Sequence, residues 1–267
     1  MAKAKPEIQE VETLEINTRR VEFCIMGTTP LIMNRFSEKA RQEMLMPAQK
    51  KNRAEKASSL KHDPVAEYRR AAYRNRNPES PTAFHMPTGA FHKAAGQAAV
   101  DLPGQAKSVM LRLTSVTSAN VDIYGIPSML ISMVRSGGMG NIPDMRTRPI
   151  FAEWACRVQF DLVSSLINQQ QLMNLVAAAG VFVGIGDWRP EKKGGPYGKY
   201  TCVSPEDENF LRIVEQQGRV PQLEAFECPE FYDSETEELF LWFEEEAKRR
   251  ELPYTPMTSG TFKMAAE

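Results

Sequence analysis

The spacing of apolar residues along the chain predicts strands and helices that follow one another in alternation. Apolar and polar residues alternate over residues 20–26, 154–162 and 197–203, which is the pattern of a half-buried strand. Residues 121–135 are interpreted as a pair of strands folded around Gly125. The sequence therefore predicts a sheet built from segments that lie far apart in the chain.

Helical patterns occupy four further segments. Asp63 followed by Pro64 predicts the start of one helix, because Asp caps a helix and Pro is tolerated in the first turn. Small residues are dense over residues 88–99, and apolar residues recur at helical spacing within residues 164–184. Residues 235–250 have an acidic start and a basic end, which suit the helix dipole. This order of elements predicts an α+β fold of the split βαβ type.

The segment from residue 180 to residue 200 is rich in glycine and combines aromatic with cationic side chains. Glycine lets backbone approach a phosphate chain closely, and aromatic rings offer faces on which bases stack. The aromatic candidates are Trp188 and Tyr197, and the cationic candidates are Arg189, Lys192, Lys193 and Lys199. The segment is neither a P-loop nor a dinucleotide fingerprint, because its glycines follow a predicted helix and no Gly-Lys-Ser/Thr opens one. Two interpretations stay open: a loop that grips nucleic acid, or a long turn whose glycines only supply positive φ.

The formal net charge of −1 conceals two segments of opposite sign. Residues 35–76 contain twelve Lys or Arg residues against five Asp or Glu residues, whereas residues 204–251 contain five against fifteen. The basic segment interleaves Arg with Tyr, which favours nucleic acid over a merely solvated helix face, because Arg binds phosphates and both side chains stack on bases. Opposite charge blocks also predict contacts between the basic face of one subunit and the acidic face of another.

The overall composition limits the other classes of function. A chain of 267 residues with 42% hydrophobic residues can build a substantial core. It has no apolar run long enough to span a membrane, and its first residues lack the apolar stretch of a signal peptide, so a cytoplasmic protein is expected. Cys24, Cys156, Cys202 and Cys228 are widely separated, which predicts reduced, packed thiols. With three histidines and no CxxC pair, neither a metal nor another cofactor is expected.

Three more segments carry candidate contacts to nucleic acid. They are the helix after Asp63, the start of the helix over residues 88–99, where a phosphate would meet the positive helix end, and an irregular segment over residues 135–149. The candidate residues in these segments are Arg69, Arg70, Tyr73, Arg74, Arg76, Thr88, Lys93, Arg135, Arg146 and Arg148.

Three segments together resemble the RAMP superfamily, in particular the backbone subunits of CRISPR effector complexes that coat a guide RNA. They are Val-Glu-Phe-Cys-Ile-Met-Gly-Thr-Thr-Pro-Leu-Ile over residues 21–32, Met-Pro-Thr-Gly-Ala-Phe-His-Lys-Ala-Ala over residues 86–95, and the glycine-rich segment. The resemblance implies a ferredoxin-like, RRM-like core with a protruding hairpin, assembled helically so that each subunit holds several nucleotides of one strand. It also implies backbone contacts by Thr88, Lys93 and the cations of the glycine-rich segment, and a wedge among Met139, Ile142 and Met145. The glycine-rich segment is also similar to segments of phage-encoded proteins, which implies a viral strand-coating protein.

The chain is accordingly divided into three parts. Residues 1–18 are expected to be a flexible arm, and residues 19–203 the nucleic-acid-binding core. Within that core, residues 35–83 form a basic helical insertion and residues 135–149 a protruding loop. Residues 204–267 are expected to be an acidic, helical C-terminal extension that makes subunit contacts.

The function expected from these features is non-enzymatic binding of single-stranded RNA or DNA by a helical homo-oligomer, without a membrane or a small-molecule cofactor. One alternative is a RAMP-type endoribonuclease, in which His85, His92 or Asp187 activates a ribose 2′-hydroxyl or organises a metal. Another is a self-assembling protein that binds no nucleic acid. The sequence does not separate RNA from DNA, because backbone and stacking contacts do not read the 2′-hydroxyl.

Overall fold

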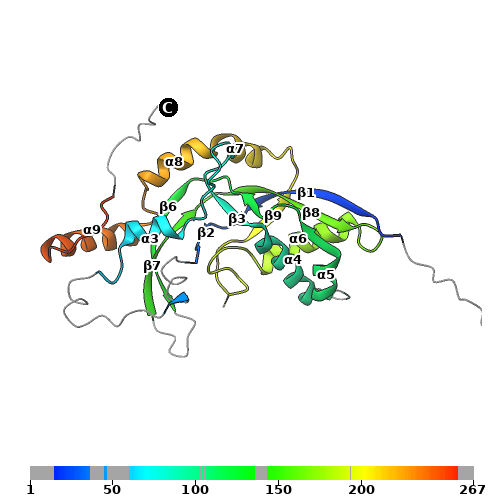
Figure 1. Ribbon diagram of the computed structural model, residues 1–267, viewed down its shortest axis with the longest axis horizontal. Helices are drawn as coiled ribbons and strands as arrows, with labels where there is room; N and C mark the ends of the chain where they lie inside the picture. Colours follow the sequence, from blue (N-terminus) through cyan, green and yellow to red (C-terminus); the bar gives the residue numbers. More distant parts are fainter. Residues whose placement is uncertain are drawn as a thin grey trace, which may run out of the picture.

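A four-stranded antiparallel sheet in the order β4-β8-β1-β9 forms the centre of the structure (Figure 1). This computed structural model describes residues 15–36, 45–46, 60–102, 104, 106–135, 143–192 and 194–257. The four strands are β1 (Thr18–Gly27), β4 (Thr114–Val116), β8 (Ala155–Val163) and β9 (Tyr200–Val203). The alternating patterns therefore identified β1, β8 and β9 correctly.

Two helices, α4 (Thr88–Asp101) and α6 (Gln169–Phe182), cover one face of this sheet, with the short α5 (Lys107–Leu113) beside α4 (Figure 1). Side chains alternate across a strand, so every second residue of β1 and β8 points into this layer. Val21, Phe23, Ile25, Val158 and Phe160 are buried there. In chain order the layer runs β1, α4, β4, β8, α6, β9, and the prediction of an α+β fold is confirmed.

The opposite face of the sheet is covered at one end by α7 (Glu208–Gln216). Phe210 of this helix is buried, and the guanidinium of Arg157 lies over its ring at 5.2 Å from the centroid. Beyond α7 the same face carries paired polar groups, such as the Arg20–Asp161 ion pair at 2.8 Å. Among the described residues of β1 and β8 that point to this side, none is aromatic.

A long hairpin of β6 (Pro127–Arg135) and β7 (Pro143–Phe151) extends from the sheet, and β2 (Leu31–Ile32) pairs with its second strand. The expectation of a strand pair around Gly125 was wrong. The preceding strand, β5 (Asn120–Asp122), pairs instead with β3 (His85–Pro87). Gly125 has φ of 144° and donates its N–H to the carbonyl of Gln217, so it carries the chain from one sheet to another without folding it back.

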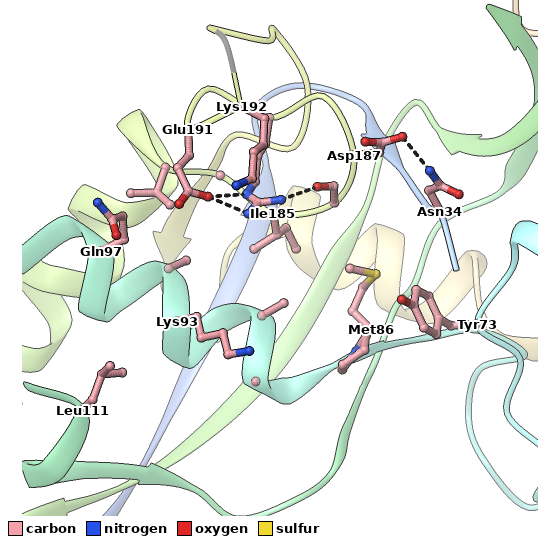
Figure 2. A pocket seen from close by; sticks show the side chains of 18 of the residues that line it. Asn34, Tyr73, Met86, Lys93, Gln97, Leu111, Ile185, Asp187, Glu191 and Lys192 are labelled. Atoms are coloured by element: carbon pink, nitrogen blue, oxygen red, sulfur yellow. Dashed lines mark hydrogen bonds and ion pairs between the residues drawn. The ribbon is translucent and has the colours of Figure 1, made fainter. Parts of the chain in front are cut away.

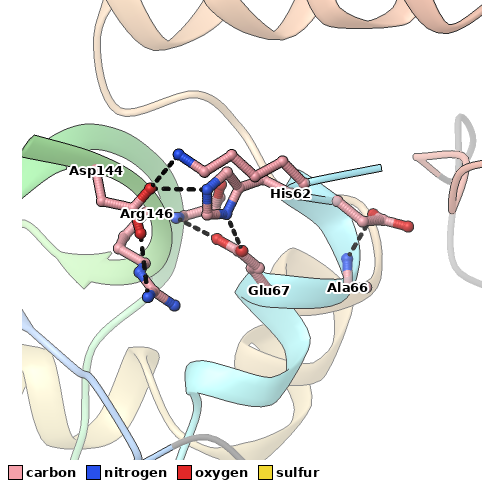
Figure 3. A network of polar contacts seen from close by, with 8 residues as sticks. His62, Ala66, Glu67, Asp144 and Arg146 are labelled. Atoms are coloured by element: carbon pink, nitrogen blue, oxygen red, sulfur yellow. Dashed lines mark hydrogen bonds and ion pairs between the residues drawn. The ribbon is translucent and has the colours of Figure 1, made fainter. Parts of the chain in front are cut away.

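The helix α3 (Pro64–Ala71) packs along β7 and begins at Asp63, whose side chain accepts from the Ala66 N–H at 3.0 Å. Just before it, the imidazole of His62 bridges two carboxylates, with Nδ1 at 2.6 Å from Glu67 Oε1 and Nε2 at 2.9 Å from Asp144 Oδ1 (Figure 3). Asp144 belongs to β7, so the bridge ties the start of α3 to the hairpin. Within the predicted basic insertion over residues 35–83, residues 37–44 and 47–59 lie outside the described residues.

The acidic extension forms α7, α8 (Arg219–Glu227) and α9 (Ser234–Arg249), and α8 and α9 pack against β6 of their own chain. Gln222 of α8 is buried and binds the Ala83 N–H and two backbone carbonyls. Phe226 stacks on Tyr68 of α3 with ring centroids 4.9 Å apart. The acidic segment is thus partly built into the fold.

The four cysteines are free thiols, and Cys24 and Cys156 are buried. Burial raises the pKa of the Cys156 thiol well above its usual value, which keeps the sulfur neutral and unreactive. Within the described parts of the chain, no helix is long and apolar enough to cross a membrane.

Candidate functional site

A cleft of about 750 Å³ opens between the first half of α4 and the loop that follows α6 (Figure 2). The loop is the glycine-rich segment of the sequence, which we call the glycine loop and define as residues 183–199. Backbone and side chains of both α4 and the loop line the walls. The lining residues are Asn34, Tyr73, Met86, Pro87, Gly89, Ala90, Lys93, Ala94, Gln97, Lys107, Leu111, Val183, Gly184, Ile185, Gly186, Asp187, Arg189, Glu191 and Lys192.

The glycine loop folds back on itself because one glycine permits a very close backbone contact. Gly198 has φ of 69°, and a Cβ at this position would lie 1.8 Å from the carbonyl oxygen of Ile185. The Ile185 N–H donates to the Gly198 carbonyl at 2.9 Å, which closes the base of the loop. A side chain here would separate these two backbones, so the loop requires glycine at this position.

Asp187 anchors the glycine loop to the rest of the protein. Its Oδ2 accepts from Arg148 Nη1 of β7 at 2.5 Å and from Asn34 Nδ2 at 2.8 Å, and its own N–H donates to the carbonyl of Ile32. Burial opposes ionisation of Asp187, but the charge of Arg148 and these hydrogen bonds outweigh it and lower the pKa of the carboxyl group. The carboxylate is therefore ionised at neutral pH and can only accept hydrogen bonds.

Arg148 was predicted to be a nucleic-acid contact, and this expectation needs correction. The residue is 1% exposed, and its guanidinium is engaged by Asp187 and by Ser132 Oγ. Thr88 is likewise fully buried, with its hydroxyl 3.4 Å from Ser118 Oγ. Neither side chain can reach a strand on the surface without rearrangement, so both support the walls of the site instead.

Lysines give the cleft its excess of positive charge. Lys93 of α4 and Lys192 of the glycine loop are exposed on opposite walls, and no described acidic group pairs with either (Figure 2). Lys107 at the start of α5 is also exposed and donates to the neutral amide of Gln97 at 2.7 Å. By contrast, Arg189 is held by Glu191 at 2.5 Å and by the Gly186 carbonyl at 3.0 Å. The two carboxylates of the lining are therefore already neutralised by arginines, which leaves the three lysines uncompensated.

The arginines expected on the helix after Asp63 do not act as a group at the cleft. The helix ends at Ala71, and of the five candidates there only Tyr73 lines the cleft. Arg69 pairs with Glu227 at 3.2 Å, and the guanidinium of Arg74 lies 5.2 Å from the centroid of Phe226, so both contact α8. Arg70 and Arg76 are exposed.

The remaining candidates are spread along the hairpin and the far side of the glycine loop. Arg135 and Arg146 are exposed near the described end of the hairpin, and Arg146 pairs with Asp144 at 3.2 Å. The rings of Trp188 and Tyr197 lie 5.5 Å apart on the glycine loop. Lys199 is half-buried, and its backbone binds the turn after β1. Met139, Ile142 and Lys193 lie outside the described residues, while Met145 packs partly buried against the core.

The residues considered for catalysis are not gathered at one point of the cleft. Asp187 lines it but is committed to Arg148, and neither His85 nor His92 belongs to its lining. Burial lowers the pKa of both histidines, so both rings are neutral at neutral pH. His92 Nε2 lies 3.1 Å from the hydroxyl of Thr114, whose proton is directed to the Met110 carbonyl. Among the described residues, no group of three His, Cys, Asp or Glu side chains is arranged to hold a metal ion.

Sequence reasoning missed the contributions of Asn34 and Lys107. Asn34 follows a two-residue strand, and nothing in its surroundings in the chain indicates that it meets residue 187. Lys107 opens a helix of seven residues, whose short apolar pattern is too weak to predict. No protein-family model matches the chain, and no curated protein matches it.

Proposed function

We propose that this chain is a non-enzymatic protein that binds single-stranded nucleic acid, with the sugar-phosphate backbone held in the cleft. The observation that carries the proposal is the convergence of Lys93, Lys107 and Lys192 on one cleft, where none of them pairs with an acidic group of the described part of the chain. Three exposed ammonium groups would attract phosphates and release their condensed counterions. Among the described lining residues no general acid and general base are paired, and this favours binding over cleavage.

The arrangement of the central layer supports a ferredoxin-like core and, with it, the kinship to RAMP proteins that the sequence suggests. The chain order β1, α4, β4, β8, α6, β9 and the strand order β4-β8-β1-β9 are those of a split βαβ pair with four antiparallel neighbours. The segment expected to be an irregular protrusion, residues 135–149, is regular in its described second half, because residues 143–149 belong to β7, while residues 136–142 lie outside the described residues.

The side of the sheet that is covered by helices is a better candidate for binding single-stranded nucleic acid than the opposite face. Many RRM domains bind RNA on aromatic side chains of the open sheet surface. Here that surface carries α7 and polar pairs such as Arg20–Asp161, and no aromatic group among the described residues of its two central strands. We therefore assign the single-stranded nucleic acid to the cleft beside α4.

We also propose that subunits associate in a helical row along the strand, in the cytoplasm of a bacterial or phage-infected cell. Helix α9 supports subunit contact, because Leu241 and Trp242 on its outer side are 51% and 63% exposed. The basic and acidic segments contribute less to subunit association than the sequence suggests, since Arg69 of the basic segment already pairs with Glu227 of its own chain. Assemblies that keep their form after RNase and DNase digestion would favour association by protein contacts alone.

The test is the salt dependence of binding to labelled single-stranded RNA and DNA, measured by fluorescence anisotropy. Alanine at residues 93, 107 and 192 together is expected to weaken binding and to lower the slope of log K against log salt by about 2, at about 0.7 per lost contact. The matched control removes three cations far from the cleft, with alanine at residues 248, 249 and 250 of α9 and the turn after it. Equal losses in the two triple variants would show that only net charge matters, and absence of binding to every strand would reject the proposal.

A further inference from the structure

Trp188 of the glycine loop is held in a backbone conformation that its side chain disfavours. Among the residues that the structure describes, only Trp188, with φ of 49°, and Glu251 combine a side chain with positive φ. This left-handed region is readily adopted by glycine and tolerated by asparagine, but a bulky side chain there is an outlier. Loops that only need to turn use glycine or asparagine at such a position.

The surrounding loop fixes this conformation from several sides. The Trp188 N–H donates to Asp187 Oδ1 at 3.0 Å, and its carbonyl accepts from the Tyr197 N–H at 3.4 Å. Gly195 leaves room for it, because a Cβ there would lie 1.8 Å from the Trp188 carbonyl oxygen and 2.5 Å from Cδ1 of the indole. The strained backbone is thus specified by the loop and is a property of the folded protein.

The indole of Trp188 is only partly buried. Trp188 is 43% exposed, in contrast to Trp154, which is fully buried in the core. It has an aromatic neighbour in Tyr197, whose ring centroid lies 5.5 Å away at an interplanar angle of 48°. The arrangement therefore holds an aromatic ring at the surface at a cost in stability, and retained backbone strain of this kind is a feature of ligand sites.

The position of Trp188 favours a nucleobase over an apolar protein segment as its ligand. Trp188 is not itself part of the cleft lining, but its chain neighbours Asp187 and Arg189 are, so it belongs to the loop that forms one wall of the cleft. Lys192 is four residues further along the same loop and carries one of the uncompensated charges. Aromatic rings beside a cationic groove are the usual elements of single-strand binding, in which phosphates take the cations and bases stack on the rings.

We infer that the exposed face of Trp188 stacks on one base of the strand whose phosphates are held by the cleft lysines. This inference rests on the proposed function and adds to it the location of one base. It predicts that binding and stability oppose each other at residue 188, because glycine would relieve the backbone strain and remove the stacking face.

The decisive variant is Trp188→Gly, compared with Trp188→Phe, which keeps an aromatic ring. Glycine is expected to weaken single-strand binding about fivefold or more, without lowering the melting temperature, while phenylalanine retains most of the affinity. The salt slope should stay unchanged in Trp188→Gly, because no phosphate contact is lost. In a Trp242→Phe background, where Trp188 is the remaining exposed tryptophan, the strand should quench its fluorescence.

The outcomes separate this inference from the proposed function. If Trp188→Gly binds with wild-type affinity to a strand that the triple lysine variant releases, the stacking site is wrong and the cleft still binds. A lower melting temperature accompanying the loss of affinity would make the indole part of the loop scaffold and overturn the inference. A changed oligomeric state of the nucleic-acid-free Trp188→Gly protein would assign the ring to a protein contact instead. If no strand binds to the wild type, both proposals fail together.

Discussion

Arg148 of β7 and Asp187 of the glycine loop form an ion pair of 2.5 Å that connects the hairpin to the cleft. Arg148 is 1% exposed, whereas the Asp187 side chain is 34% exposed on the cleft side. The pair joins residues 39 positions apart in the chain and attaches the glycine loop to β7. The β6–β7 hairpin and the glycine loop that lines the cleft are therefore directly connected.

Substitution of Asp187 by Asn is expected to destabilise the protein. The amide keeps the shape of the side chain but leaves the Arg148 guanidinium buried without a counter-charge, at a cost of up to about 3 kcal/mol in the free energy of unfolding. Chemical denaturation measures this change. The control is Glu153→Gln, which breaks an exposed pair with Arg212 and should cost less than about 1 kcal/mol. Equal stability of the two variants would contradict a structural role for the Arg148–Asp187 pair.

Gly194 and Gly198, two of the three described glycines in the glycine loop with φ of 69°, have different surroundings. Gly194→Ala should cost about 1 kcal/mol, because only the left-handed backbone opposes the methyl group and no atom lies within 4 Å of it. Gly198→Ala should cost about 3 kcal/mol, because its Cβ also meets the Ile185 carbonyl. Thermal and chemical unfolding measure the loss of stability in each of the two variants. Identical costs would show that the close contact relaxes freely.

His62 is expected to stabilise the protein at low pH more than at high pH. Its hydrogen bond to Glu67 is the largest cause that raises the pKa of the imidazole, with Asp144 adding to it against the opposing effect of burial. A raised pKa in the folded state means that the stabilisation is complete below the unfolded value of about 6.5 and is lost as pH rises through the folded value. The difference in unfolding free energy between wild type and His62→Gln should therefore shrink as the pH is raised.

His92 supplies a control of opposite sign for this pH experiment. Burial lowers the pKa of His92, so its contribution is present above the unfolded value and is lost as the pH falls. The difference between wild type and His92→Gln should consequently shrink toward acid pH. If both differences move in the same direction, the ion bridge of His62 to Glu67 and Asp144 is not maintained in solution.

Gln222 is expected to be essential for docking α8. Its carbonyl oxygen accepts from the Ala83 N–H at 2.7 Å, and its amide donates to the carbonyls of Ile123 and Gly125 at 2.7 and 2.9 Å. Gln222→Met fills the same volume but leaves these buried backbone groups unpaired, which should cost about 2–3 kcal/mol. On the surface of α6, Gln170→Met should change stability by less than about 0.5 kcal/mol. A tolerated Gln222→Met would mean that water replaces the amide.

The local elements were predictable where a residue's own neighbours in the chain determine them. Alternation identified β1 and β8, because a strand with one buried face must repeat every second residue. The Asp63–Pro64 pair located the start of α3, since capping involves only the next few residues. Glycines and cations marked the glycine loop, but the same pattern was also compatible with a plain turn.

Strand pairing was less predictable, because a periodic pattern reports that a residue is buried and not what covers it. The segment around Gly125 alternates as a hairpin does, yet β5 pairs with β3 and β6 with β7. Hydrogen bonding of Gly125 to Gln217, far along the chain, contributes to that outcome. A contact between segments that are far apart in the chain leaves no pattern in the sequence around either residue.

The sequence alone determined the α+β class, the positions of β1, β8, β9, α3, α4, α6 and α9, and the concentration of candidate chemistry in the glycine loop. Only the tertiary structure decided which cations share a cleft, bringing Lys93, Lys107 and Lys192 together and placing Arg148 and Thr88 inside the protein. The physical reason is that local propensity acts over a few residues. Whether a charge faces solvent, a carboxylate or a ligand depends on packing between segments that are distant in the chain.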